Sequence, residues 1–329
     1  MPLPADAKVL ETAEGLKNTL QGIFGRHPGF RPGKSPLQSF PFSTYTSGKL
    51  TMHAAHAKGI LLKGTFTPTD KAKSLSKAQH FNNVTPVIAR FSSSTGIPVI
   101  PDTDANGNPR GLAIRFQLAD TPRRVHTDIV SHSTPFFPAK NGEDALAFFK
   151  SIPAGTVMEW IATHDEARAF ATAPKPTPAS FATEKYFSVN AFRLVDAEGN
   201  GTFVRYRFAP VAGEKHLSDE EVKAKGANFL YDEISELVKK GPVEFKLLVQ
   251  IAQEGDVTND NTVHWPEERE VAELGTISLS ELVENDAAEQ KNIIFDPIPR
   301  VEGVEPSDDP LLEVRAGVYL LSGRERRAA

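Results

Sequence analysis

Two histidines stand three positions apart in HAAHAKG, residues 53–59. Their imidazoles could bind one metal ion together, or one of them could act as a catalytic base, because histidine titrates near neutral pH. The stretch that follows, ILLKGTF at 60–66, has the composition of a strand. If the strand spans 53–62, His53 and His56 point to opposite faces and cannot share an ion. A histidine at a strand start is more often structural or solvated than catalytic, so spacing alone leaves its role open.

Composition narrows the classes of protein. The 329 residues carry a net charge of −5 and no cysteine. The charge gives no basic footprint for nucleic acid, and no apolar run is long enough to cross a membrane. Without cysteine there is no disulfide, zinc ribbon or thiolate-ligated haem, so a bound metal would need nitrogen or oxygen ligands. The first residues lack a secretory signal, which predicts a cytoplasmic protein, or a periplasmic one if a signal has been removed.

The elements that would position these histidines come mostly before residue 210. An amphipathic helix is predicted over 6–24, followed by an extended Pro/Gly/Ser-rich arm over 27–48. Strand patterns recur after it, and AEGNG at 197–201 closes a hairpin. The expected strands cover 60–69, 85–93, 111–119, 126–134, 190–196 and 202–208.

Helices alternate with further strands in the rest of the chain. The patterns predict helices over 142–152 and 218–241, the second with a Ser218/Glu221 capping box and Gly241 as its stop. Strand character returns at 246–253 and 275–282. The whole pattern predicts an α+β fold built around an antiparallel barrel or a strongly curled sheet. Common catalytic signatures such as HExxH, the Walker loop, GxGxxG and GxSxG are missing from the sequence.

Eight blocks occur in the order in which they are found in haem catalases, and the resemblance covers about residues 50–327. The chain is most similar to the small catalase-related peroxidases, because its amino-terminal arm is short and the resemblance ends close to the last residue. The blocks are HAKG (56–59), RFSSSTG (90–96), NPRGLAIRF (108–116), STPFFP (133–138), DALAFF (144–149), NAFRLVDAEGNGTFVRYRF (190–208), FDPIPRVEGVEPSDDPLLEVRAGVY (295–319) and RERR (324–327).

The resemblance implies a fold and a domain organisation. We expect a catalase-like α+β fold with an antiparallel eight-stranded β-barrel core and surrounding helices. The amino-terminal arm would be reduced and an extra carboxy-terminal domain would be absent. Residues 1–329 would form a single haem domain in which 1–50 are the first helix and the arm.

The resemblance also assigns the residues on the peroxide side of the haem. His56 matches the distal histidine, which takes a proton from one peroxide oxygen and delivers it to the other. Ser92 matches the serine that bonds the far nitrogen of that imidazole. Val130, Phe137 and Phe148 match the apolar residues that narrow the approach and pack near the haem.

On the opposite side of the haem, Tyr319 matches the phenolate that ligates the iron, which makes it the expected metal ligand. Arg315 stands one helical turn earlier, where its guanidinium can donate to the phenolate oxygen. Arg326 lies about two turns later, so all three would share one side of a helix. Gly317 and Gly323 weaken that helix, which should then depend on packing.

Arg90 and Arg326 match arginines that bind the haem propionates. Three positions depart from the family pattern. The distal asparagine is His132, a channel aspartate is Asn108, and a further propionate-side arginine is His53. His56 is thus the expected base, and His53 is expected on the opposite strand face, nearer the propionates.

The function implied is a haem b peroxidase that reduces hydrogen peroxide or organic hydroperoxides through a ferryl intermediate, with an organic electron donor and weak catalase activity. Its partners would be small molecules, without nucleic acid or a membrane span, and a homo-oligomer is left open. Three alternatives remain. They are a rearranging enzyme that resembles allene oxide synthases, a non-catalytic haem carrier or sensor, and a haem-free β-barrel binding protein. Product analysis, the need for His56 and the colour of the protein separate them.

Overall fold

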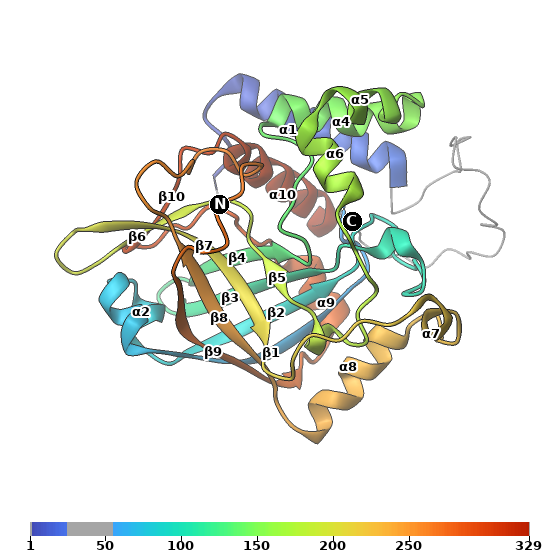
Figure 1. The fold of residues 1–329 in the computed structure, drawn as a ribbon. Helices are drawn as coiled ribbons and strands as arrows, with labels where there is room; N and C mark the ends of the chain where they lie inside the picture. Colours follow the sequence, from blue (N-terminus) through green and yellow to red (C-terminus); the bar gives the residue numbers. More distant parts are fainter. Residues whose placement is uncertain (1, 25–54, 329) are drawn as a thin grey trace.

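A closed antiparallel barrel forms the centre of the molecule (Figure 1). The structure is a computed structural model that describes residues 2–24 and 55–328. Within these residues eight strands close the barrel in the order β7-β5-β4-β3-β2-β1-β9-β8, with β8 pairing back onto β7. Two further strands, β6 and β10, extend the sheet beyond β7. The strands are β1 (Gly59–Pro68), β2 (Thr85–Ser92), β3 (Gly111–Ala119), β4 (Val125–His132), β5 (Tyr186–Phe187), β6 (Phe192–Val195), β7 (Gly201–Pro210), β8 (Val243–Ile251), β9 (Val271–Leu282) and β10 (Val304–Pro306).

The barrel forms because apolar side chains alternate along these strands and close on one interior. On β2, for example, Val87, Ala89 and Phe91 belong to the main core cluster. The residues between them, including Ile88 and Arg90, therefore face outward. Figure 1 shows α10 on the same side of the barrel as α1 and α4, with α8 below. The outward positions of β1 to β4 can consequently form a site against these covering helices.

The helices differ in what they cover. Helix α10 packs against α1 and α4 through a second apolar cluster that includes Ala13, Leu16 and Val318. Helix α8 contributes Leu230 and Ile234 to the main core. The helical segments are α1 (Ala7–Phe24), α2 (Asp70–Leu75), α3 (Gln79–Asn82), η1 (Ala105–Gly107), α4 (Gly142–Ala154), α5 (Val157–Thr163), α6 (Asp165–Thr172), η2 (Phe181–Thr183), α7 (Asp219–Lys223), α8 (Phe229–Lys240), α9 (Asp286–Asn292) and α10 (Leu311–Ala328).

The predicted fold class is confirmed, and so is the hairpin, in which Val195 pairs with Gly201. Two local predictions were wrong. The helix over 218–241 is two helices, α7 and α8, separated by residues 224–228, although the capping box and the stop at Gly241 are present. The strand expected over 60–69 is present as β1, but the strand assumed over 53–62 does not include residues 55–58, so His56 lies before β1. The arm over 27–48 lies outside the described residues.

Across 2–24 and 55–328, none of the helices combines the length and hydropathy that a membrane crossing needs.

Candidate active site

Two rows of outward-facing positions cross strands β1 to β4. In the first row Arg90 pairs with Ala113, which pairs with Val130 on β4. In the second row Ser92 pairs with Gly111, which pairs with His132. Paired residues on neighbouring strands point to the same face of the sheet, and so do residues two apart on one strand. Each row therefore brings residues that are far apart in the sequence onto one face.

His56 lies over the second row in an uncommon backbone conformation. Its φ of 55° is in the left-handed region, which few non-glycine residues adopt. Its backbone N–H donates to the Ser94 carbonyl at 3.1 Å, and its Nδ1 lies 3.0 Å from Ser92 Oγ. A Cβ at Gly111 would stand 2.5 Å from Ser92 Oγ and 2.8 Å from His56 Nδ1. Glycine at 111 therefore leaves the room that this contact needs.

The electrostatic surroundings keep the His56 imidazole neutral. Burial lowers its pKa to about 4, and the positive charges of Arg90 and Arg315 act in the same direction. At neutral pH the ring is thus unprotonated. In the tautomer with hydrogen on Nδ1, the ring donates to Ser92 and Nε2 keeps its lone pair.

His132 lies at the end of the second row with neither ring nitrogen hydrogen-bonded to the protein. Burial lowers its pKa to about 3, with contributions from His56, Arg315 and Lys175. The ring of Phe137 is centred 6.4 Å away. Burying two ring nitrogens without hydrogen bonds costs folding free energy unless a bound molecule supplies the missing partners. The His132 nitrogens are therefore suited to bind a small polar molecule.

Helix α10 carries the other half of the site. Arg315 donates through Nη2 to Tyr319 Oη at 3.2 Å and through Nη1 to Asn190 Oδ1. Asn190 in turn donates to Asp309 Oδ2 at 2.7 Å. Asp309 also accepts the backbone N–H of Leu311 at 2.9 Å, at the first residue of α10. The chain of contacts fixes the guanidinium beside the phenol.

Three arginines in this region have neutral partners. Arg90 donates to Gln290 Oε1 and the Ala57 carbonyl, Arg326 donates to the Ile293 carbonyl, and the Nε of Arg326 has no acceptor. Burial lowers the pKa of Arg90 to about 10 and, with the charge of Arg90, that of Arg326 to about 9. In the described part of the chain, no carboxylate oxygen lies within 4.0 Å of Arg90, Arg315 or Arg326. The cations therefore fit an anionic ligand that brings its own carboxylates.

The remaining predicted residues are less closely tied to this site. Val130 packs in an apolar cluster with Ile293 and Phe295, the segment that follows α9. Phe137 packs in the α1–α10 cluster, which also includes Tyr319. Phe148 is buried on α4, where its ring is 5.2 Å from that of Phe149. His53 lies outside the described residues.

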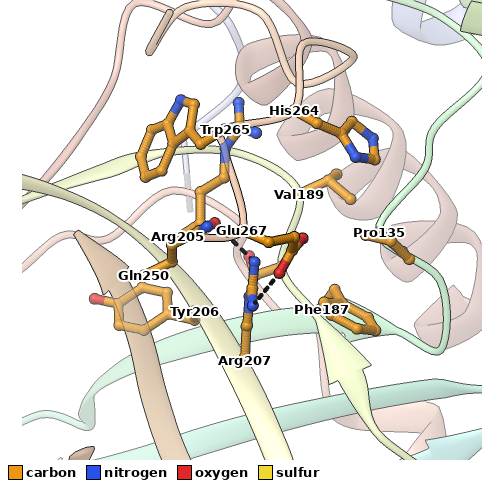
Figure 2. Close-up of a pocket in the computed structure, with 11 residues that line it drawn as sticks. Pro135, Phe187, Val189, Arg205, Tyr206, Arg207, Gln250, His264, Trp265 and Glu267 are labelled. Carbon is orange, nitrogen blue, oxygen red and sulfur yellow. Dashed lines mark hydrogen bonds and ion pairs between the residues drawn. The ribbon is translucent and has the colours of Figure 1, made fainter. Parts of the chain in front are cut away.

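A second pocket lies beside the end of the second row, since Phe187 in its lining is the strand partner of His132. Arg205 stacks over Trp265 at 4.4 Å and donates to the Val263 carbonyl, and Arg207 donates to Glu267 at 3.2 Å (Figure 2). Its cations are thus already paired within the protein. In the described residues no group of three histidine or carboxylate side chains could hold a bare metal ion.

The chain was compared with protein families, other protein sequences and solved structures. A crystal structure of a fungal catalase superposes with a TM-score of 0.73, covering 84% of this chain and 59% of that one at 22% identity, so the fold is that of catalases. The catalase family model matches residues 42–329. Catalase-related peroxidases from Synechococcus elongatus and Mycolicibacterium paratuberculosis are both 34% identical, over 82% and 83% of this chain and 82% and 88% of their own lengths. The chain belongs to the catalase family, whose members bind haem and act on peroxide.

Sequence reasoning missed some residues that support the site. Asn190 and Asp309 hold Arg315, and both stand inside blocks that had been recognised by resemblance. Lys58, beside the predicted base, is buried in an ion pair with Asp102. The position of Lys58 inside the HAKG block could have marked it as a supporting residue, but its partner Asp102 could be identified only from the fold.

Proposed function

We propose that this chain is a haem b peroxidase, which reduces hydrogen peroxide or organic hydroperoxides with an organic electron donor and has weak catalase activity. The supporting observation is a neutral imidazole, His56, held by Ser92 near cations that have no carboxylate partner within residues 2–24 and 55–328. Such a base is suited to moving a proton between two peroxide oxygens. The family relationship supports the same reaction class.

The residues described fit a haem in chemical terms. Tyr319 would ligate the iron through its phenolate oxygen, toward which Arg315 already donates. Arg90 and Arg326 would bind the two propionates, with His53 nearby. Val130, Phe137 and Phe148 would supply apolar surface to the ring. When bound, haem supplies a redox-active iron that accepts oxidising equivalents from peroxide.

His56 performs the proton transfer in this proposal. Its Nε2 accepts the proton from one peroxide oxygen and returns it to the other, so that when the O–O bond breaks the second oxygen leaves as water, or as an alcohol from an organic hydroperoxide. Ser92 holds the imidazole in one tautomer through Nδ1. The donor then supplies two electrons, and two protons complete the reduction of the remaining oxygen to water.

His132 accounts for the proposed preference for donor oxidation over dismutation. Dismutation needs a second peroxide held in a fixed orientation, which favours a compact hydrogen-bond donor beside the base. Here that position holds a bulkier imidazole, kept neutral by burial. A second peroxide would therefore be oriented less well.

The test uses haem-loaded protein, with oxidation of a phenolic donor and release of oxygen measured on the same sample. Wild type should oxidise the donor readily and release oxygen slowly. His56→Ala should lower the rate of donor oxidation by about 100-fold or more while haem content is kept. His80→Phe changes another buried histidine outside the site and should leave the rate unchanged. Retention of the rate in His56→Ala would reject the assigned base, and rapid oxygen release with little donor oxidation would reject the peroxidase.

A further inference from the structure

Lys58 is held unusually firmly for a lysine. Its side chain is 10% exposed, and its ammonium nitrogen lies 2.6 Å from Asp102 Oδ1 and 2.9 Å from the Ile100 carbonyl. A longer contact of 3.4 Å reaches the Ala227 carbonyl. Three donors thus meet three oxygens, which leaves the ammonium no further hydrogen-bond donor for solvent or a ligand.

The partner of Lys58 is fixed equally well. The Asp102 side chain is fully buried, and its second oxygen accepts the backbone N–H of Leu230, in the first turn of α8, at 2.9 Å. Its backbone N–H donates to Ala227, and its carbonyl accepts from Arg110 Nη2 at 2.7 Å. The ion pair therefore ties the segment before β1 to α8 on the outside of the barrel.

The same network reaches residues close to both histidines of the site in the sequence. Lys58 is two residues after His56, and its carbonyl accepts from the Tyr231 hydroxyl at 2.9 Å and from the Ser93 N–H at 3.0 Å. Arg110 donates to Ser93 Oγ at 2.8 Å, and its backbone exchanges two hydrogen bonds with Ser133, the neighbour of His132.

The conformation of His56 needs such support. A left-handed φ costs an ordinary residue free energy and persists only where its surroundings enforce it. We propose that the Lys58–Asp102 ion pair is a positioning device that holds His56 in this conformation, so that Nδ1 stays on Ser92. The proposal rests on the proposed role of His56 as the base.

The test is a double-mutant cycle on haem-loaded protein. Lys58→Met/Asp102→Asn replaces the ion pair by a neutral pair, in which asparagine can still accept the Leu230 N–H. It is made in the wild-type and in the His56→Ala background, and the rate of reaction with hydrogen peroxide is measured. Lys63→Met is the matched control, because it removes an exposed ion pair between Lys63 on β1 and Glu281 on β9. Tyr231→Phe removes one hydrogen bond to the Lys58 carbonyl and serves if the double change does not fold.

We expect the double change to lower the rate about ten-fold when His56 is present and less than about two-fold when it is absent. Equal losses in both backgrounds, or no loss in either, overturn the proposal. A crystal structure of the variant gives a readout that does not depend on activity. The His56 Nδ1 to Ser92 Oγ distance should exceed about 3.5 Å. An unchanged contact and φ would reject the positioning role. If His56→Ala itself leaves the rate unchanged, the proposed function fails, and the crystal structure alone still decides this inference.

Discussion

Arg315 is the residue on which the α10 half of the site depends. One of its nitrogens bonds Tyr319 Oη and another bonds Asn190, which Asp309 fixes in turn. A guanidinium held in this way keeps a charged hydrogen-bond donor on the phenol oxygen, the atom proposed to bind iron. Tyr319 is the only side chain of the site for which a bond to iron is proposed.

Replacing Tyr319 by phenylalanine removes that oxygen and little else. Because the proposed ligand is lost, haem content should fall, or the Soret and charge-transfer bands should shift strongly. Absorbance spectra at equal protein concentration measure this. Tyr206→Phe removes a hydroxyl from the barrel core and should keep the spectrum. A Tyr319→Phe protein with unchanged haem content and spectrum would contradict the assignment.

Two glycines of helix α10 allow it to pack closely against neighbouring segments. A Cβ at Gly317 would lie 2.7 Å from the Cβ of Ala13 on α1, and one at Gly323 would lie 2.3 Å from Ile294 Cδ1. Glycine costs helix propensity, and here it allows the close approach that packing rewards. The position of Tyr319 relative to the barrel is thereby set by small residues on both sides of the helix.

Gly317→Ala should lower the free energy of unfolding by about 1–3 kcal/mol, because the added methyl separates α10 from α1. Gly22→Ala on α1 is the matched control. Its Cβ meets nothing within 4 Å, so it should stabilise by up to about 1 kcal/mol. Thermal unfolding of both haem-loaded variants provides the measurement. A Gly317→Ala protein as stable as wild type would show that the two helices separate without cost.

Local sequence patterns were sufficient to predict most secondary-structure elements but not the backbone of the site. Period-2 alternation gave most barrel strands, and the capping box gave the start of α7. Resemblance identified Ser92 and His132, and the strand register places both in one row, with Gly111 between them. The left-handed His56 was beyond prediction, because tertiary contacts impose that conformation against local preference. The two-residue strand β5 was missed because it is too short to show alternation.

At the scale of the whole molecule, three buried histidines make stability depend on pH. Burial lowers the pKa of His56 to about 4 and those of His80 and His132 to about 3, against about 6.5 in an unfolded chain. Between these values the unfolded chain binds more protons, so the free energy of unfolding falls as the pH falls below about 6.5. Buried carboxyls whose pKa is raised, such as Glu184 and Asp309, act in the opposite direction.

His80 is suited to a test of this effect, because it lies on α3, against the tilted rings of Phe81 and Phe116, away from the site. His80→Phe removes a group that must stay neutral in the folded state. Relative to wild type, the variant should gain about 2 kcal/mol of stability at pH 5 compared with pH 7.5. Denaturant unfolding at both pH values measures the difference, and any constant packing cost cancels. An identical pH dependence in both proteins would mean that His80 does not remain neutral in the fold.

The two halves of the site come from distant parts of the chain. The rows on β2 to β4 are complete by residue 132, whereas α10 begins at Leu311, after β9, the last strand of the barrel. During synthesis the ribosome therefore delivers the face of Arg90 and His132 long before Tyr319 exists. The apolar part of this barrel face, around Leu61 and Val130, stays uncovered until Ile293 and Phe295 have been synthesised. A nascent chain with this surface exposed is prone to associate with other chains. If Tyr319 binds the iron as proposed, the complete haem site exists only after α10 has been translated.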